Sequence, residues 1–162
     1  MEWLLFFEKS LWFGFGAIGF AVLFNVPART LFVIGILGAI GGTIKIVCMH
    51  YGLNVITATL LGATTVGILS IWAAYNKNAP PLVFSIPSII PMIPGVFIYK
   101  MILGVIALSG DIDTQTYTLT LAQTVNYASK VIFIITSIAV GVSMPLLIIR
   151  QTASKNSKFQ HQ

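Results

Sequence analysis

Five long apolar segments dominate the sequence and restrict the chain to very few folds. Each has about the 20 residues that an α-helix needs to cross the hydrocarbon core of a bilayer. Only 8% of the residues are charged and 57% are hydrophobic, whereas a soluble domain carries about 25% charged residues. Because so few polar residues cannot cover a soluble core, the sequence predicts an all-helical integral membrane protein.

The predicted spans follow these segments, with polar or proline-containing turns between them. They lie at about 4–24, 31–49, 53–75, 82–109 (with 95–109 as its regular part) and 128–149. Residues 1–150 then form one transmembrane domain, and residues 151–162 form a polar cytoplasmic tail. We expect the threonine-rich stretch 110–126 to be a loop outside the membrane that grows into the fifth helix, with Asp113 or Thr114 as the helix N-cap.

The distribution of charge predicts the orientation of the chain. With five spans, the loops on one side of the membrane carry only basic residues, and those on the other side carry only acids. The positive-inside rule then places the N-terminus outside and the C-terminus in the cytoplasm. The basic side holds Arg29, Lys77, Arg150, Lys155 and Lys158, and the acidic side holds Glu2, Asp111 and Asp113.

Several classes of function find no support in the sequence. The net charge is +5, but the nine basic residues are scattered and form no nucleic-acid-binding face. There is no nucleophile motif or phosphate-binding glycine loop, so we predict neither an enzyme nor a cofactor. Cys48, His50 and His161 have no partners at metal-ligand spacing, so we predict no metal site.

Pairs of small residues recur four positions apart within the predicted spans. Such pairs allow two helix backbones to approach closely in lipid. We therefore predict helix packing, with no implied transport role, at these positions. The pairs are Gly38 and Gly42, Ala58 and Gly62, Ala63 and Gly67, and Ser137 and Gly141.

The fourth segment contains the sequence IPSIIPMIPGVFIYK (86–100), with Pro87, Pro91 and Pro94 followed by Gly95. As one helix, 82–109 would be about 42 Å long, whereas 95–109 alone would be about 22 Å; the hydrocarbon core is about 30 Å thick. We predict that 85–94 crosses part of this depth in non-helical form. In a discontinuous transporter helix, such a break exposes a half-helix N-terminus that attracts anionic substrates. The alternative is a proline-rich hairpin at the cytoplasmic interface.

Two lysines within the predicted spans are candidate ligands for a substrate, because ionisable groups at membrane depth usually serve a function. Lys45 either faces the bundle, where it would bind a carboxylate, or extends its long side chain to the outer headgroups. Lys100 follows Gly95 in the same short helix and could instead pair with a partner chain. The predicted substrate-binding set is Lys45, Pro91, Pro94, Gly95 and Lys100.

Four fragments, in order along nearly the whole chain, carry a resemblance to a known family. They are GFAVLFNVPAR (19–29), GAIGGTIKIV (38–47), YGLN (51–54) and IPMIPG (90–95). Together they resemble the small membrane subunit of the two-component threonine/serine exporter family. The family motifs carry over to Asn25, Pro27, Arg29, Gly38, Gly41, Lys45, Gly52, Asn54, Pro91, Pro94 and Gly95, whereas Pro87 is expected to be structural and Lys100 lies outside the motifs.

The resemblance implies a multi-pass subunit of the bacterial inner (cytoplasmic) membrane that works with a larger membrane subunit. It also implies export of threonine or serine driven by an ion gradient, or of a dicarboxylate such as succinate, as in some relatives. Two other roles stay open at this point. One is a non-transporting scaffold for the larger subunit, and the other is a homo-oligomeric channel.

Overall fold

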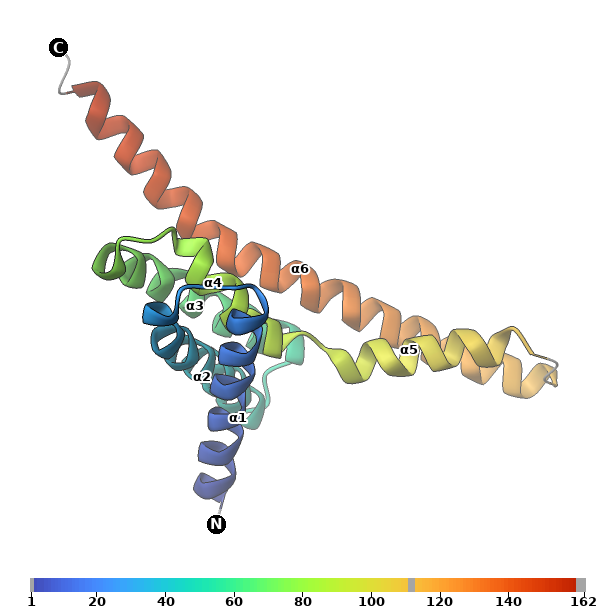
Figure 1. Cartoon of the computed structure of the whole chain (residues 1–162). Helices are drawn as coiled ribbons and strands as arrows, with labels where there is room; N and C mark the ends of the chain where they lie inside the picture. The colour runs from blue at the N-terminus through green and yellow to red at the C-terminus, as the bar shows by residue number, and fades with distance from the viewer. Residues whose placement is uncertain (1, 111–112, 160–162) are drawn as a thin grey trace. The chain divides into compact units, whose positions relative to one another are not determined.

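The computed structural model describes residues 2–110 and 113–159, and their side chains except at positions 2, 3, 5 and 150–159. In these residues every regular element is a helix, and there is no strand. The elements, in order, are α1 (Glu2–Leu23), α2 (Ala28–His50), α3 (Val55–Lys77), α4 (Pro81–Ile89), the 3₁₀ helix η1 (Ile90–Met92), α5 (Gly95–Leu108) and α6 (Thr114–Phe159) (Figure 1).

Four of these helices are long and apolar enough to cross a membrane: α1, α2, α3 and α6. Pro81–Met92 and Gly95–Leu108 form a bent pair that passes the same test together, which raises the number to five. The all-helical membrane fold and the break within the fourth segment are therefore confirmed.

The chain divides into two compact units, and each is considered by itself. The bundle unit comprises Met1–Met92 and Ser137–Gln162, so it contains α1 to α4, η1 and the last part of α6. The hairpin unit comprises Ile93–Thr136, so it contains α5 and the first part of α6.

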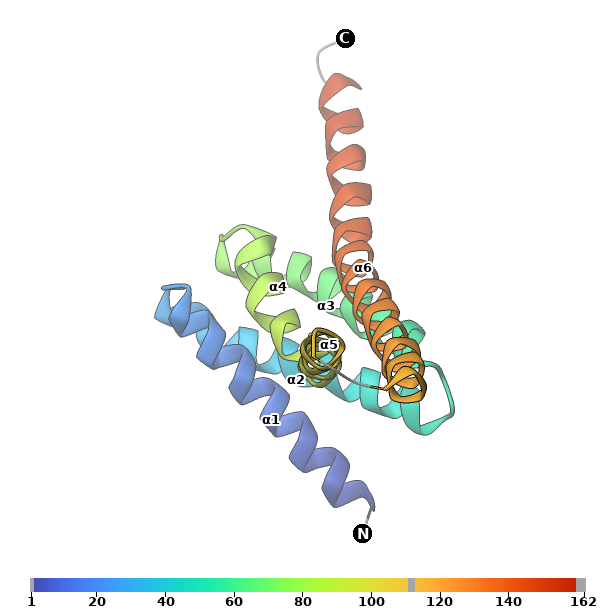
Figure 2. The ribbon, with the colours of Figure 1, turned by 90° about the vertical axis from the view of Figure 1, so that its right-hand side faces the viewer.

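Within the bundle unit, α2 and α4 lie at the centre. Both helices pack against α1 and α3 as well as against each other (Figure 2). Small residues at the helix contacts make this possible. A Cβ atom on Gly38 would meet Ala17 of α1, and one on Gly141 of α6 would lie 2.9 Å from the Cβ of Ala63 of α3. The predicted small-residue packing is therefore confirmed at these contacts.

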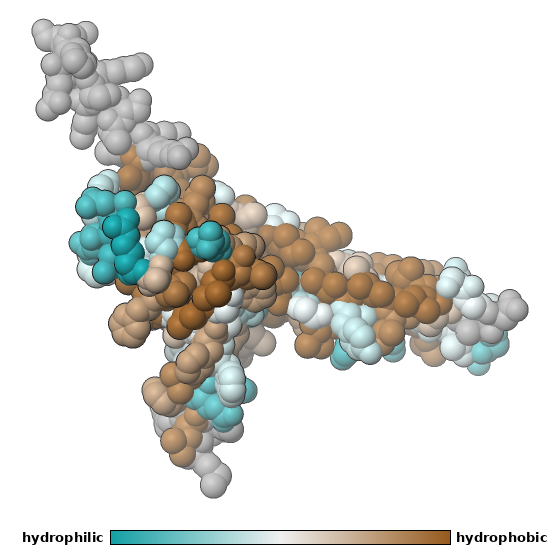
Figure 3. Space-filling model, viewed as in Figure 1, coloured by the Kyte–Doolittle hydropathy of each residue, from teal (hydrophilic) through white to brown (hydrophobic). Residues whose placement is uncertain are grey.

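The bundle unit has a small apolar core and a strongly apolar surface. Ala17, Ile34 and Phe84 are fully buried, whereas Phe32 and Trp72 are 76% and 67% exposed. Figure 3 shows apolar surface along the helices, with hydrophilic side chains gathered at the turn between α3 and α4. Such an outward-facing apolar surface suits lipid, because soluble proteins rarely expose large apolar patches.

The stretch 110–126, which we predicted as a loop that grows into the fifth helix, is helical from Thr114 onward, so the loop is much shorter than predicted. Hydroxyl groups explain the error, because they can bond to the preceding turn of their own helix. Thr118 Oγ1 donates to the Gln115 carbonyl at 2.9 Å, and Thr124 Oγ1 donates to the Thr120 carbonyl at 2.7 Å. Asp113 is the N-cap, as predicted: its Oδ2 accepts from the Thr116 amide at 3.1 Å.

The helix α6 also continues into the segment predicted as a polar tail. Its backbone is helical to Phe159, so residues 151–159 extend the helix that contains the predicted span 128–149. Several residues that predict the orientation lie outside the described residues or side chains, and the orientation stays a prediction. These are Glu2, Asp111, Arg150, Lys155 and Lys158; His161 also lies outside.

Candidate functional site

The proline-rich break is narrower than the sequence suggested. Of the predicted non-helical residues 85–94, those up to Ile89 belong to α4, which contains Pro87, and Ile90–Met92 form one 3₁₀ turn. Only Ile93 and Pro94 lie outside a helix. Pro87 removes the hydrogen bond that an amide at position 87 would give to the Val83 carbonyl, four residues earlier. One residue on, the Ser88 hydroxyl donates to the Phe84 carbonyl at 2.7 Å.

Lys45 is directed to this break from α2. Its Nζ donates a hydrogen bond of 2.8 Å to the carbonyl oxygen of Met92, the last residue of η1. A carbonyl at the end of a helix has no partner in its own helix, and lipid offers none. Of the two predicted orientations of Lys45, the structure therefore shows the one toward the bundle.

The side chain of Met92 anchors the same point from the other side. It is fully buried, and its Sδ and Cε atoms lie against Gly41 of α2 and Gly62 of α3. A Cβ atom built on Gly41 would lie 3.5 Å from Sδ of Met92, and one built on Gly62 would lie 2.6 Å from its Cε. Because these two glycines have no side chain, α2 and α3 approach closely and leave room for the methionine.

Pro91 packs against α1, where a Cβ atom on Gly16 would lie 3.2 Å from its Cγ. The last turn before the break is therefore fixed by all three neighbouring helices of the bundle unit: α1 at Pro91, α2 at Lys45 and Gly41, and α3 at Gly62.

The half-helix after the break begins at Gly95, as predicted. The amides of Phe97 and Ile98 both donate to the Pro94 carbonyl, at 3.0 and 3.1 Å, and no side chain caps the helix. A Cβ atom on Gly95 would meet nothing within 4 Å. An N-terminus without a side-chain cap keeps part of its positive end available to an anion.

Lys100 belongs to the hairpin unit, whereas Lys45 belongs to the bundle unit. The structure places Lys100 Nζ over the ring of Tyr127 on α6, 5.4 Å from the ring centre. Tyr127 and the nearby Lys130 did not emerge as candidates from the sequence. The signal that could have identified them is an aromatic residue followed three positions later by lysine, which occurs at both Phe97 and Tyr127.

In the two turns of the bundle unit that contain family motifs, the motif residues shape the backbone and the starts of the following helices. Asn25 adopts a left-handed φ of 55°, and Pro27 precedes α2, where its carbonyl accepts from Thr30 Oγ1 at 2.8 Å. The side chain of Arg29 is exposed at this turn. At the other turn, Gly52 has a φ of 85°, which favours glycine, and Asn54 caps α3 by accepting from the Ile56 amide at 3.3 Å.

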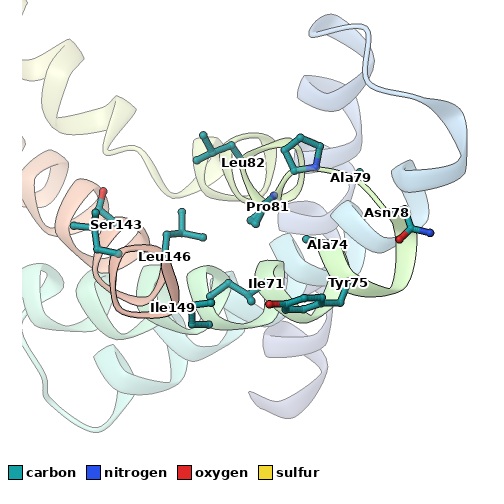
Figure 4. Close-up of a pocket in the computed structure, with 12 residues that line it drawn as sticks. Ile71, Ala74, Tyr75, Asn78, Ala79, Pro81, Leu82, Ser143, Leu146 and Ile149 are labelled. Atoms are coloured by element: carbon teal, nitrogen blue, oxygen red, sulfur yellow. The ribbon is translucent and has the colours of Figure 1, made fainter. Parts of the chain in front are cut away.

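A cavity of about 770 Å³ in the bundle unit lies between α3, the start of α4 and the last part of α6, and Lys45 is not among its lining residues. Its described lining contains no charged side chain; Tyr75, Asn78 and Ser143 are its polar members (Figure 4). Because a carboxylate needs a cation or several donors when it leaves water, this cavity does not suit a charged metabolite. Nor do the described residues contain any cluster of three or more potential metal ligands.

Comparison with known proteins places the whole membrane region in one family. The sequence profile described as "Threonine/Serine exporter, ThrE" matches residues 9–148. A curated protein of Haemophilus influenzae (strain Rd), named only as an uncharacterized protein, is 31% identical over 138 residues. The match covers 83% of this chain and 45% of that relative, so the chain spans about half the length of the relative. No solved structure matches the chain. The chain belongs to the threonine/serine exporter family.

Proposed function

We propose that this chain is the small subunit of a secondary exporter in the bacterial inner membrane, and that it carries a small carboxylate metabolite of the threonine/serine type together with a larger membrane subunit. Membership in the exporter family supports transport. The match to about half of a longer relative fits a chain that needs a second part to act.

The observation that carries the proposal is the hydrogen bond from Lys45 to Met92 at the broken segment. It turns a cation toward the break, where a discontinuous helix in a transporter commonly binds its substrate. An ammonium group has three donors, and the Met92 carbonyl takes one of them. The other two donors can bind a carboxylate.

In this mechanism the family motif residues have different roles. Pro91, Pro94 and Gly95 interrupt the helix, and Lys45 supplies a positive charge at the Met92 carbonyl. Asn25, Pro27 and Arg29 hold the turn before α2, with Arg29 at the cytoplasmic surface, where anionic lipid or the partner would bind it. A dicarboxylate such as succinate also presents a carboxylate. Export must therefore be measured for both amino acids and dicarboxylates to identify the substrate.

The test compares the metabolites in the medium of cells that have both subunits with those of cells that lack this chain. We expect a threonine- or serine-type metabolite to accumulate outside only when both subunits are present. Export at full rate by the larger subunit alone, once it is stably inserted, would contradict the proposal and favour a role outside transport. Flux through this chain reconstituted alone would instead identify a channel.

A further inference from the structure

The hairpin unit contains a symmetric cluster of two lysines and two aromatic rings. Phe97 and Lys100 lie three residues apart on α5, and Tyr127 and Lys130 lie three residues apart on α6. The two rings stack with their centres 6.2 Å apart and an angle of 21° between their planes. Each lysine crosses to the ring of the other helix: Lys100 lies 5.4 Å from Tyr127, and Lys130 lies 5.5 Å from Phe97.

The positive charge of this cluster has no acidic partner within the described residues of the unit. Lys130 Nζ is also 5.9 Å from the Tyr127 ring, so both ammonium groups share one aromatic neighbour. The only described acid of the unit is Asp113, whose carboxylate caps α6. It precedes Tyr127 by about 21 Å along the helix. Lys100 is exposed and Lys130 is partly buried. Because cation–π contacts stabilise a lysine only modestly, both ammonium groups keep N–H donors that can bind an anion.

A pocket of about 310 Å³ adjoins the cluster. Lys100 and Tyr127 line it together with Thr120, Gln123 and Thr124. Its size is at the lower end of ligand pockets in proteins, which suits a metabolite of a few heavy atoms. A close approach of the two helices shapes it, because a Cβ atom on Gly104 would meet the hydroxyl of Thr124.

The pocket offers donors and acceptors together. Lys100 contributes three N–H donors and Gln123 contributes an amide, which has both donor and acceptor atoms. The hydroxyl of Thr124 donates to the Thr120 carbonyl at 2.7 Å, so its oxygen remains an acceptor toward the pocket. A cation beside several neutral polar groups is the arrangement that recognises a carboxylate attached to a small polar body.

We propose that Lys100 and Lys130 form a second carboxylate-binding site, in which Lys100 contacts the carboxylate of a small metabolite in the pocket and Lys130, whose Nζ lies 5.9 Å from the centre of the Tyr127 ring, adds positive charge nearby. The site rests on the proposed function for the identity of the ligand, and it lies in the hairpin unit, whereas Lys45 lies in the bundle unit. The transported metabolite would then have a second binding site on this chain.

Equilibrium binding tests the site on the full chain in nanodiscs of neutral phosphatidylcholine, which removes anionic lipid as a competitor. The probes are radiolabelled threonine and radiolabelled succinate, each measured separately in a Lys45→Met background that lacks the cation at the break. We expect saturable binding of at least one probe, and no competition by threoninamide, which lacks the carboxylate.

Three further variants in this background locate the binding. Lys100→Met should weaken it by roughly 10- to 100-fold, which corresponds to the loss of a charged hydrogen bond. Lys130→Met should weaken it by about two- to tenfold, because this charge acts at a longer distance. Lys77→Met removes an exposed cation of the bundle unit and serves as the matched control with unchanged binding. Lys100→Arg keeps the positive charge. If Lys100→Met weakens binding because it removes that charge, Lys100→Arg should retain binding.

Two results overturn the proposal. One is binding that Lys100→Met leaves unchanged. The other is the absence of saturable binding, in which case the lysines meet an acidic side chain of the larger subunit. Export from cells is measured in parallel. If export requires this chain but Lys100→Met leaves binding unchanged, the second site is wrong and the proposed function stands. If Lys100 determines binding but no metabolite is exported, the proposed function is wrong and the site stands.

Discussion

Lys45 of α2 donates a hydrogen bond of 2.8 Å from Nζ to the carbonyl oxygen of Met92, 47 residues later in the chain. The bond joins a basic residue of a continuous helix to the last residue before the break in the fourth apolar segment. It holds Met92 in place within the bundle unit, and it connects two of the family motifs in space.

Lys45→Met is expected to destabilise the protein and to abolish or strongly reduce transport. The substitution keeps the length of the side chain but leaves the Met92 carbonyl without its donor, at a cost of about 1.5–3 kcal/mol. Thermal unfolding in detergent and uptake of labelled substrate into inverted vesicles measure the two effects. Lys9→Met, which removes an exposed cation of α1, is the control. Normal transport in a correctly assembled Lys45→Met variant would show that this lysine has no part in transport.

The double variant Pro94→Ala with Gly95→Ala is expected to lower transport by favouring one continuous helix across the break. Alanine restores the amide that proline lacks, and it favours the helix over glycine by about 1 kcal/mol. Gly95→Ala alone should be tolerated, since a Cβ atom there meets nothing within 4 Å. Uptake into inverted vesicles compares the two. Full activity of the double variant would exclude a mechanism that depends on the half-helix.

Gly41→Val is expected to destabilise the bundle unit by about 1–3 kcal/mol through overpacking. Any side chain at this position meets Val66 of α3 and approaches the Gly62 carbonyl to 3.4 Å. Gly19→Ala is the matched control, because a Cβ atom there meets nothing within 4 Å, and helix propensity alone should make this variant neutral or slightly more stable. Thermal unfolding of the two variants decides the matter, and equal stability would contradict the close packing.

Ser85→Ala is expected to stabilise the protein by about 1–3 kcal/mol. The Ser85 hydroxyl is fully buried, and within the described residues its oxygen has no hydrogen-bond partner, which is a costly arrangement. Ser88→Ala, on the same helix, should instead destabilise, since the Ser88 hydroxyl bonds to the Phe84 and Ile34 carbonyls. Thermal midpoints test the opposite signs. A loss of stability in Ser85→Ala would indicate that water or a ligand occupies the site.

The first turn of α6 is expected to loosen in acid. Hydrogen bonding to Thr116 lowers the pKa of Asp113 from 3.8, so the folded state favours the charged carboxylate. This stabilisation is fully present above the unfolded pKa, near 3.8, and it is lost as the pH falls through the lower folded pKa. Amide hydrogen exchange at Thr116 measures it, with Asp113→Ala as the comparison. Exchange that does not differ between the two proteins would contradict the cap.

Much of the site could be predicted from the sequence where the local chemistry is strong. Asn54 and Asp113 cap helices, and Gly52 has the left-handed backbone that glycine favours. Gly95 begins a new helix after Pro94. Each of these depends on groups a few residues apart, so a short stretch of sequence contains the information.

The prediction failed where a local signal had two outcomes. A threonine-rich stretch is typical of a loop, yet after Thr114 these hydroxyls bond within α6. Prolines at 87 and 91 favour a non-helical stretch, yet α4 and η1 include them. In both cases the residue type allows either structure, and the short stretch of sequence does not decide between them.

The sequence by itself determined that this protein is a bundle of membrane helices with one broken segment, because apolar length and proline chemistry act locally. Only the tertiary structure decided that Lys45 bonds to Met92. The same holds for the two cation–π contacts, in which Lys100 lies over Tyr127 and Lys130 lies over Phe97. These contacts join residues 27 to 47 positions apart. They depend on which helix faces approach each other, and that choice follows from the fit of glycines against side chains across the whole unit.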